Sequence, residues 1–196
     1  DDGDGVADAS DAFPLDSSET IDTDSDGTGN NADNDDDEDG VEDDDDVYPL
    51  DATLWSMKIE DALAGIADDN LRACVAEATS GKQQVSEVTE LNCARRQVSA
   101  LNGLSGLTNL IFLDLFGNQI TDVSELSGLI NLNQLRLDNN QITNVSPLSG
   151  LTNLTTLVLH DNQVTDVSEL SGLINLTFLN LGNNQITDIS GLSGLT

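Results

Sequence analysis

The chain has 196 residues, and its 37 acidic side chains against 6 basic ones give a formal net charge of −31. This balance excludes a nucleic-acid binder, which neutralises phosphates with lysine and arginine, and it makes an anionic membrane surface an unfavourable partner. The acid is concentrated at one end, because residues 1–51 hold 22 acidic side chains and no lysine or arginine. This segment is too acidic and too poor in apolar residues to fold around a hydrophobic core of its own.

No run of 18 apolar residues is present, so the sequence predicts no insertion into a membrane. The first residues also lack the charged and then apolar pattern of a signal peptide. The chain opens and closes in the middle of a repeated motif. We therefore read it as a fragment of a longer protein, and we draw nothing about targeting from the missing signal.

A motif recurs in the acidic segment. DGVADASDAFPLD at residues 4–16 returns as DGVEDDDDVYPLD at residues 39–51, and DTDSDGTGNNAD lies between them. Oxygens at loop positions 1, 3 and 5 can converge on one hard cation, and glycine at position 6 permits the turn that directs the next carbonyl inward. Positions 9 and 12 carry oxygen donors in each copy as well. The predicted Ca²⁺ ligands are Asp2, Asp4, Asp8, Asp11, Asp22, Asp24, Asp26, Asn30, Asp33, Asp35, Asp37, Asp39, Asp43 and Asp46.

The alternative for this segment is a solvated, disordered tail, since most runs of charge are solvated. Three copies in register favour calcium, and Pro14 and Pro49 argue against an EF-hand, which needs a helix on each side of the loop. The pattern in residues 1–51 resembles the cysteine-free, bacterial form of the thrombospondin type 3 repeat. That resemblance implies an irregular, calcium-wrapped stalk in an extracellular and often adhesive protein, to which we assign residues 1–57.

A period of 22 residues governs the second segment. Its copies open at Leu107, Leu129, Leu151, Leu173 and Leu195, and the four clear ones contain the pattern L-x-x-L-x-L-x-x-N. Each copy is a short strand with a tight return that cannot bury its own leucines, so the copies must stack. One slot holds a recurring amide, which we expect to bond to the backbone of neighbouring copies. It is occupied by Asn118, Asn140, Asn162 and Asn184.

The same register extends upstream to a fifth, divergent copy that begins near Val85. Residues 58–84 precede it, and the helical spacing within residues 59–78 predicts an N-terminal cap in two pieces, with Asp69 or Asn70 capping the second. Cys74 falls on this cap and Cys93 in a core slot of the first strand. A disulfide between them is expected, with two buried thiols as the alternative.

The repeats resemble the 22-residue type found in internalins, as in ITDVSELSGL and ITNVSPLSGL after the recurring asparagine. The resemblance covers residues 85–196 and implies an α/β solenoid, a right-handed leucine-rich repeat superhelix of about five copies, truncated at its C-terminus. It also implies a parallel concave sheet that binds ligand and short helical turns on the convex side.

Side chains alternate along a strand, so those beside the core leucines are expected on the concave face. Three of the four phenylalanines lie at such positions, and exposed aromatic side chains near charges are typical of binding surfaces. The alternative is that they only cover the sheet. His160 is expected to be a solvated strand residue, with a pH-sensitive contact or a ligand as the alternative. The predicted ligand-binding residues are Phe112, Asp114, Phe116, Arg136, Asp138, Val158, His160, Phe178 and Asn180.

No arrangement of residues predicts catalysis, so we expect no enzyme activity. The sequence predicts a calcium-binding adhesion or recognition protein, secreted or at the cell surface, whose concave face binds a protein or a glycan. One alternative is a non-catalytic accessory module of a larger secreted enzyme. Another is a calcium-dependent spacer without a ligand.

Overall fold

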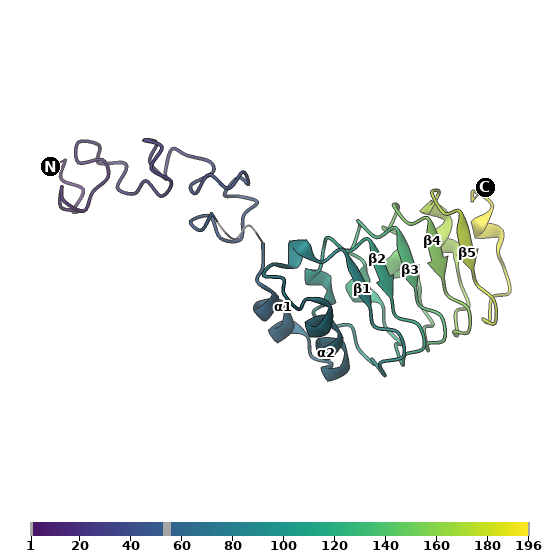
Figure 1. The fold of residues 1–196 in the computed structure, drawn as a ribbon. Coiled ribbons are helices and arrows are strands. Elements are labelled where there is room, and N and C mark those ends of the chain that lie inside the picture. Colours follow the sequence, from purple (N-terminus) through teal and green to yellow (C-terminus); the bar gives the residue numbers. More distant parts are fainter. Residues whose placement is uncertain (1, 53–55, 196) are drawn as a thin grey trace. The chain divides into compact units, whose positions relative to one another are not determined.

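The computed structural model describes residues 2–52 and 56–195, and its contacts divide the chain into two units, Asp1–Met57 and Lys58–Thr196 (Figure 1). Residues 53–55, which fall within the stalk predicted from the sequence, lie outside the described residues. So does Thr196, which follows the leucine that opens the last predicted copy. Within the two described ranges, no helix is both long enough and apolar enough to span a bilayer.

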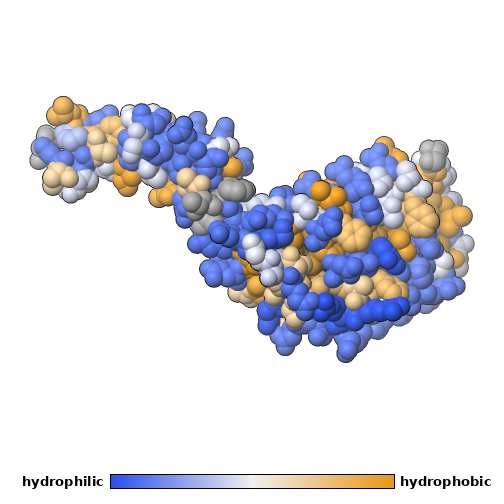
Figure 2. All heavy atoms as spheres, viewed as in Figure 1, coloured by the Kyte–Doolittle hydropathy of each residue, from blue (hydrophilic) through white to orange (hydrophobic). Residues whose placement is uncertain are grey.

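The N-terminal unit is a succession of turns and bends, and its described residues form neither helix nor strand. None of its described hydrophobic side chains is buried, and Leu15 and Leu50 are 89% and 58% exposed. Figure 2 shows this unit as mostly hydrophilic on the face in view. The burial of apolar surface therefore does not hold this unit together, which agrees with the composition of its sequence.

The second unit begins with two short helices, α1 (Ile59–Gly65) and α2 (Asp69–Ala78), and α2 contacts the first strand. The N-cap of α2 is Asp68, whose carboxylate accepts hydrogen bonds from the backbone of Asn70 and Leu71. The prediction of this cap at Asp69 or Asn70 is wrong, because the helix already begins at Asp69 and its N-cap is the preceding residue. Asp68 satisfies two of the amide groups that every helix leaves free at its start.

Five three-residue strands form one parallel sheet in chain order. Partner residues are 22 apart throughout, as in the pair of Leu113 and Leu135. The divergent first copy pairs in the same register, which confirms the upstream extension of the repeat. The strands are β1 (Glu90–Asn92), β2 (Phe112–Asp114), β3 (Gln134–Arg136), β4 (Thr156–Val158) and β5 (Phe178–Asn180).

A short 3₁₀ helix lies in the return of each copy, where a tight connection is needed (Figure 1). The leucines of successive copies pack into one continuous core between these turns and the sheet, and Leu113, Leu135 and Leu157 are fully buried. This core forms only by stacking, as the sequence requires. The 3₁₀ helices are η1 (Val85–Glu87), η2 (Leu104–Gly106), η3 (Ser124–Leu126), η4 (Ser146–Leu148), η5 (Ser168–Gly172) and η6 (Ser190–Leu192).

The recurring asparagines form the expected ladder. Asn140 is typical: its amide nitrogen donates to the carbonyls of Leu115 and Leu137, and its oxygen accepts from the amide of Ile120. Each such side chain therefore joins two copies through buried backbone groups, which would otherwise remain unpaired. The prediction of a structural role for these residues is confirmed.

A second asparagine ladder was missed in the sequence. Each of its members donates to a backbone carbonyl of the preceding copy, as Asn131 does to Thr108 at 3.0 Å. The repeated pairs Thr-Asn and Ile-Asn that open each copy were the available signal. The members are Asn109, Asn131, Asn153 and Asn175.

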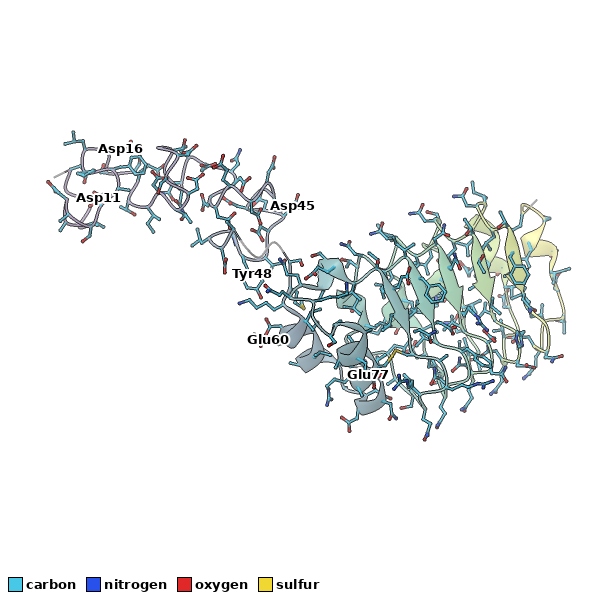
Figure 3. The ribbon with its side chains drawn as sticks, in the orientation of Figure 1. Asp11, Asp16, Asp45, Tyr48, Glu60 and Glu77 are labelled. Atoms are coloured by element: carbon cyan, nitrogen blue, oxygen red, sulfur yellow. A yellow bond between two sulfur atoms is a disulfide. The ribbon has the colours of Figure 1, made fainter. Side chains whose placement is uncertain are left out.

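Helix α2 is linked to the first copy by a covalent bond and by an ion pair. Cys74 and Cys93 form the expected disulfide, and Figure 3 shows it beside the helix that carries Glu77. The two carboxylate oxygens of Glu77 accept from the guanidinium of Arg96, the residue that replaces the ladder asparagine in this copy. The arginine that replaces the ladder asparagine in the first copy thus contacts helix α2.

Candidate calcium loops and strand face

Three groups of carboxylates come together in the N-terminal unit. Within each group, one oxygen from each of three aspartates lies within 4.8 Å of the others. The groups occupy the early positions of the three predicted loops, except that Asp11, at position 12, completes the first. They are Asp2, Asp4 and Asp11; Asp22, Asp24 and Asp26; and Asp35, Asp37 and Asp39.

The backbone at position 6 of each loop has the conformation that the motif requires. Gly5, Gly27 and Gly40 have φ values of 103°, 97° and 96°. A side chain at such a φ is strained, so glycine allows the sharp turn that gathers the aspartates before it. Figure 3 shows the acidic side chains, including the labelled Asp11 and Asp45, along this irregular backbone.

Several carboxylate oxygens in these loops are buried and accept no hydrogen bond. Asp37, for example, is only 7% exposed, and its Oδ2 has no donor. Burial, followed by the negative charges of Asp39 and Asp46, raises the pKa of Asp37. A buried anion without a donor is costly, and a hard divalent cation is the ligand that such oxygens suit. The loop oxygens in this state belong to Asp2, Asp4, Asp22, Asp35, Asp36, Asp37, Asp39 and Asp46.

The residues at position 9 are placed differently from the clustered aspartates. Asn30 accepts from the amide of Thr23 and donates to its hydroxyl, and Asp43 accepts from the amide of Asp36. These contacts brace the loop from position 2 to position 9. Asn30, Asp43 and Asp8 are not in the three groups, so their role as ligands stays a prediction.

Position 12 is occupied by Asp11, Asp33 and Asp46. Asp11 is a member of the first group, and Asp46 has a buried oxygen without a donor. Asp33 instead accepts from the amides of Asn34 and Asp35 through one oxygen. The three copies therefore use this position unequally, and Asp33 and Asp46 also stay predicted ligands.

The other candidate surface is the strand face, which we define as the side of the sheet that carries the nine predicted ligand-binding residues. These residues are less uniformly exposed than simple alternation predicts. Phe178 is 53% exposed, whereas Phe112 and Phe116 are half-buried. Figure 2 shows apolar residues interspersed with hydrophilic ones over the strands.

Three of the predicted residues are almost inaccessible. Asp114, Asp138 and Val158 are only 5%, 1% and 8% exposed. Their low exposure does not follow from alternation alone, since Arg136 contacts Asp114 and both Arg136 and His160 contact Asp138. Their role as ligand-binding residues stays a prediction. Asn180 on β5 is half-buried, and its oxygen accepts from the amide of Gly182.

Arg136 on β3 connects the two buried carboxylates of this face. Its guanidinium lies 3.3 Å from an oxygen of Asp114 and 3.3 Å from an oxygen of Asp138. The same guanidinium lies over the ring of Phe116, at 5.4 Å from the ring centre, and Arg95 lies over that ring at 4.8 Å. Both cations are attracted to the π-electrons of the ring, so Phe116 is held by two arginines.

His160 is paired rather than solvated, contrary to the expectation from sequence. Its Nε2 lies 3.2 Å from Asp138, and its Nδ1 lies 2.9 Å from Asp161. Hydrogen bonds from Asn183 and then from His160 lower the pKa of Asp161. Arg95 and Asp161 were not predicted as site residues. Both could have been found by aligning the copies, since they occupy the same slot three copies apart.

Comparison with known proteins identifies the repeats. The family model of leucine rich repeats in two copies matches residues 108–150 and 152–194. No curated protein matches the chain. Several solved structures do, and one is an internalin (inlF) from Listeria monocytogenes, with 35% identity and a TM-score of 0.65 over 69% of this chain and 43% of that one.

Two further structures share this similarity. The functional domain of InlJ from Listeria monocytogenes, which includes a cysteine ladder, is 32% identical with a TM-score of 0.59, over 71% of this chain and 32% of that one. A leucine-rich repeat protein from Leptospira interrogans is 33% identical with a TM-score of 0.52, over 57% and 30%. The chain thus spans less than half the length of each of these proteins. Its second unit contains an internalin-like leucine-rich repeat domain.

Proposed function

We propose that this chain is an extracellular recognition protein whose strand face, the concave face of the solenoid, binds a partner protein. The observation that carries the proposal is the cluster around Arg136, where a guanidinium, a half-buried phenyl ring and two buried carboxylates meet on one surface. Arginine and aromatic side chains in such settings commonly dominate the energy of binding. Similarity to internalins, which are surface or secreted proteins, supports the extracellular assignment.

The two helices before β1 act in this proposal as the N-terminal cap of the solenoid. Their apolar side chains, among them Ile59, Leu71 and Val75, are buried in the same core as the first leucines. A repeat array needs such an element to cover its first copy. The disulfide then fixes the cap to that copy.

The acidic unit is proposed to bind calcium through its three carboxylate groups, as a type 3 repeat stalk. The buried oxygens without donors support this, as does the fact that none of the apolar side chains described in this unit is buried. A unit of this composition gains little from hydrophobic burial, so bound cations would supply most of its folding energy. Aspartates at the early loop positions would hold each ion.

Binding by the strand face is tested with a triple variant, Phe112→Ala, Phe116→Ala and Phe178→Ala. The purified full chain is immobilised, and the adhesion of host cells or extracts of their surface proteins is measured. We expect adhesion to fall at least about tenfold, as loss of central aromatic side chains does in other interfaces. Circular dichroism must first show that the variant is folded.

The matched control replaces two exposed residues that lie outside the strands. Ile130 and Ile174 are 57% and 69% exposed, and we expect a double alanine variant to adhere as well as the wild type. Unchanged adhesion by a folded triple phenylalanine variant would refute the role of the strand face.

A further inference from the structure

The cluster on the strand face holds more negative charge than its arginine can balance. Asp114 is satisfied, because one oxygen accepts from the amide of Phe116 and the other contacts Arg136. Asp138 is not: it is 1% exposed, and its Oδ1 accepts no hydrogen bond from any described residue. Two buried carboxylates thus share one guanidinium, and a buried charge without full compensation is destabilising.

Among the described residues, the ion pairs of Asp138 are with Arg136 and with His160, which is charged only when protonated. Both of its ring nitrogens face carboxylate oxygens, one of Asp138 and one of Asp161. A neutral imidazole donates through one nitrogen only, so both contacts are satisfied only when the ring is protonated. The compact arrangement in this structure is therefore the one that suits the imidazolium.

Few other charged groups face His160. From β3, Arg136 contacts the same oxygen of Asp138. On the side of β5, the neutral Gly182 lies beside His160. The carboxylate of Asp161 also accepts from the amides of Asn139 and Asn183, which are neutral. The charge of the ring is thus opposed by Arg136 and favoured by two aspartates.

We propose that Asp138 is a contact for a basic side chain of the bound protein, and that His160 is a gate which closes this contact when it is protonated. The proposal rests on the proposed recognition function and specifies the chemistry of the partner. A lysine or arginine would supply the positive charge that the two buried carboxylates lack. The field of an acidic protein attracts such a partner.

The gate follows from the geometry of the imidazole. When the neutral ring donates to Asp161, at the shorter of the two distances, its other nitrogen presents a lone pair to Asp138. Two lone pairs facing each other repel, so the ring turns away and Asp138 becomes accessible. Protonation restores the second donor of the ring, so the imidazolium covers Asp138 again and closes the site. The partner's cation and the imidazolium compete for the same carboxylate.

The test uses the full chain in saturating calcium at physiological ionic strength, with tetra-arginine as the probe and tetra-glutamate as its counterpart. Because His160 is the only histidine, its imidazole signals in a proton NMR spectrum report on this site alone. We expect tetra-arginine to shift these signals at pH 8 and tetra-glutamate to leave them unchanged. Binding at pH 5.5 should be about tenfold weaker, since a charged contact is lost.

Three variants complete the experiment, with the affinity for labelled tetra-arginine as the measurement. Asp138→Asn should bind about tenfold more weakly at pH 8. His160→Gln should keep binding at pH 8 and lose its dependence on pH, and it carries the test if Asp138→Asn fails to fold. Glu169→Gln removes an equal charge from the exposed η5 turn and should behave as the wild type.

Equal affinity of wild type and Asp138→Asn would overturn the proposal, as would a pH dependence that survives in His160→Gln. These results would leave the proposed function standing if the triple phenylalanine variant still lost adhesion. If that variant adheres normally while tetra-arginine binds as expected, the site exists and the proposed recognition function fails.

Discussion

The carboxylate of Asp68 joins helix α2 to Ser99 in the first copy of the repeat. One oxygen caps the helix, and the other accepts from the amide and the hydroxyl of Ser99, both at 2.8 Å. Burial opposes ionisation of this group, but the hydrogen bonds from Ser99, Leu71 and Ala100 outweigh it and lower the pKa of Asp68 to about 2. One side chain therefore stabilises both the helix and its attachment.

This relationship predicts how stability depends on pH. Because the folded pKa lies below the ordinary value of 3.8, the ionised carboxylate stabilises the fold above about pH 4, and that contribution is lost as the pH falls towards 2. The difference corresponds to about 2 kcal/mol. In urea unfolding at pH 7, we expect the unfolding free energy of Asp68→Asn to be lower than that of the wild type by this amount. Near pH 2, the two unfolding free energies should be equal.

The control is the adjacent Asp69→Asn. Asp69 is 89% exposed and pairs only with Arg72 one turn away, and exposed pairs contribute little. Its substitution should change the unfolding free energy by less than about 0.5 kcal/mol. Equal stability of the two variants at pH 7 would contradict the role of Asp68.

The disulfide predicts a second contribution at the same junction. It closes a loop with a sequence separation of 19 between Cys74 and Cys93. By restricting the unfolded chain, the bond should stabilise the fold by about 3 kcal/mol. We expect the double variant Cys74→Ala and Cys93→Ala to have an unfolding free energy in urea that is lower by about this amount. Reductant should lower the unfolding free energy of the wild type and leave that of the double variant unchanged. A wild type that is insensitive to reductant while unfolding would count against this contribution.

The repeat could be predicted in detail because one period carries it. The 22-residue spacing placed Leu113 and Leu135 in the core and paired the strands in the correct register. Burial along a solenoid is a one-dimensional pattern, so sequence suffices. The predicted helix cap, Asp69 or Asn70, lies one or two residues too late, because Asp68, Asp69 and Asn70 are all suitable capping residues and only the contact of Asp68 with the first copy distinguishes them.

The arrangement of the strand face was harder to predict. Alternation correctly placed Asp138 and His160 on one face, but it does not include cross-strand neighbours, which bury Asp138 and pair it with the histidine. Residues in equivalent slots of adjacent copies lie side by side in a parallel sheet. Asp138 and His160 are 22 apart, so comparison of slots would have revealed the pair.

The asparagine ladder predicts a large effect from one buried amide. Asn140→Ala removes the acceptor for Ile120 and the donor for Leu115 and Leu137. Buried backbone groups would lose their partners, so we expect a loss of about 3 kcal/mol in unfolding free energy. Asn102→Ala removes an exposed amide that lies outside both asparagine ladders, and it should change stability by less than about 0.5 kcal/mol. Similar losses for both variants would contradict the ladder.

The folding of the acidic unit should depend on calcium. With chelator we expect residues 2–52 to lack fixed structure, because their carboxylates repel and no apolar core compensates. Addition of calcium should order them, with affinities of roughly 10⁻⁴ to 10⁻³ M as in extracellular modules. Circular dichroism and the hydrodynamic radius, followed through a calcium titration, measure this transition. An unchanged radius and spectrum would refute the calcium proposal.

A single substitution tests whether the third loop binds calcium through specific oxygens. Asp37→Asn neutralises a 7% exposed carboxylate with an oxygen that has no donor, so one of the three loops should lose its ion in calorimetric titration. Asp45→Asn removes the same charge from an exposed position in the same loop (Figure 3) and should retain all three ions. Because the two variants have equal net charge, general electrostatic attraction would weaken binding equally in both. Only coordination by specific oxygens makes Asp37 the costlier loss.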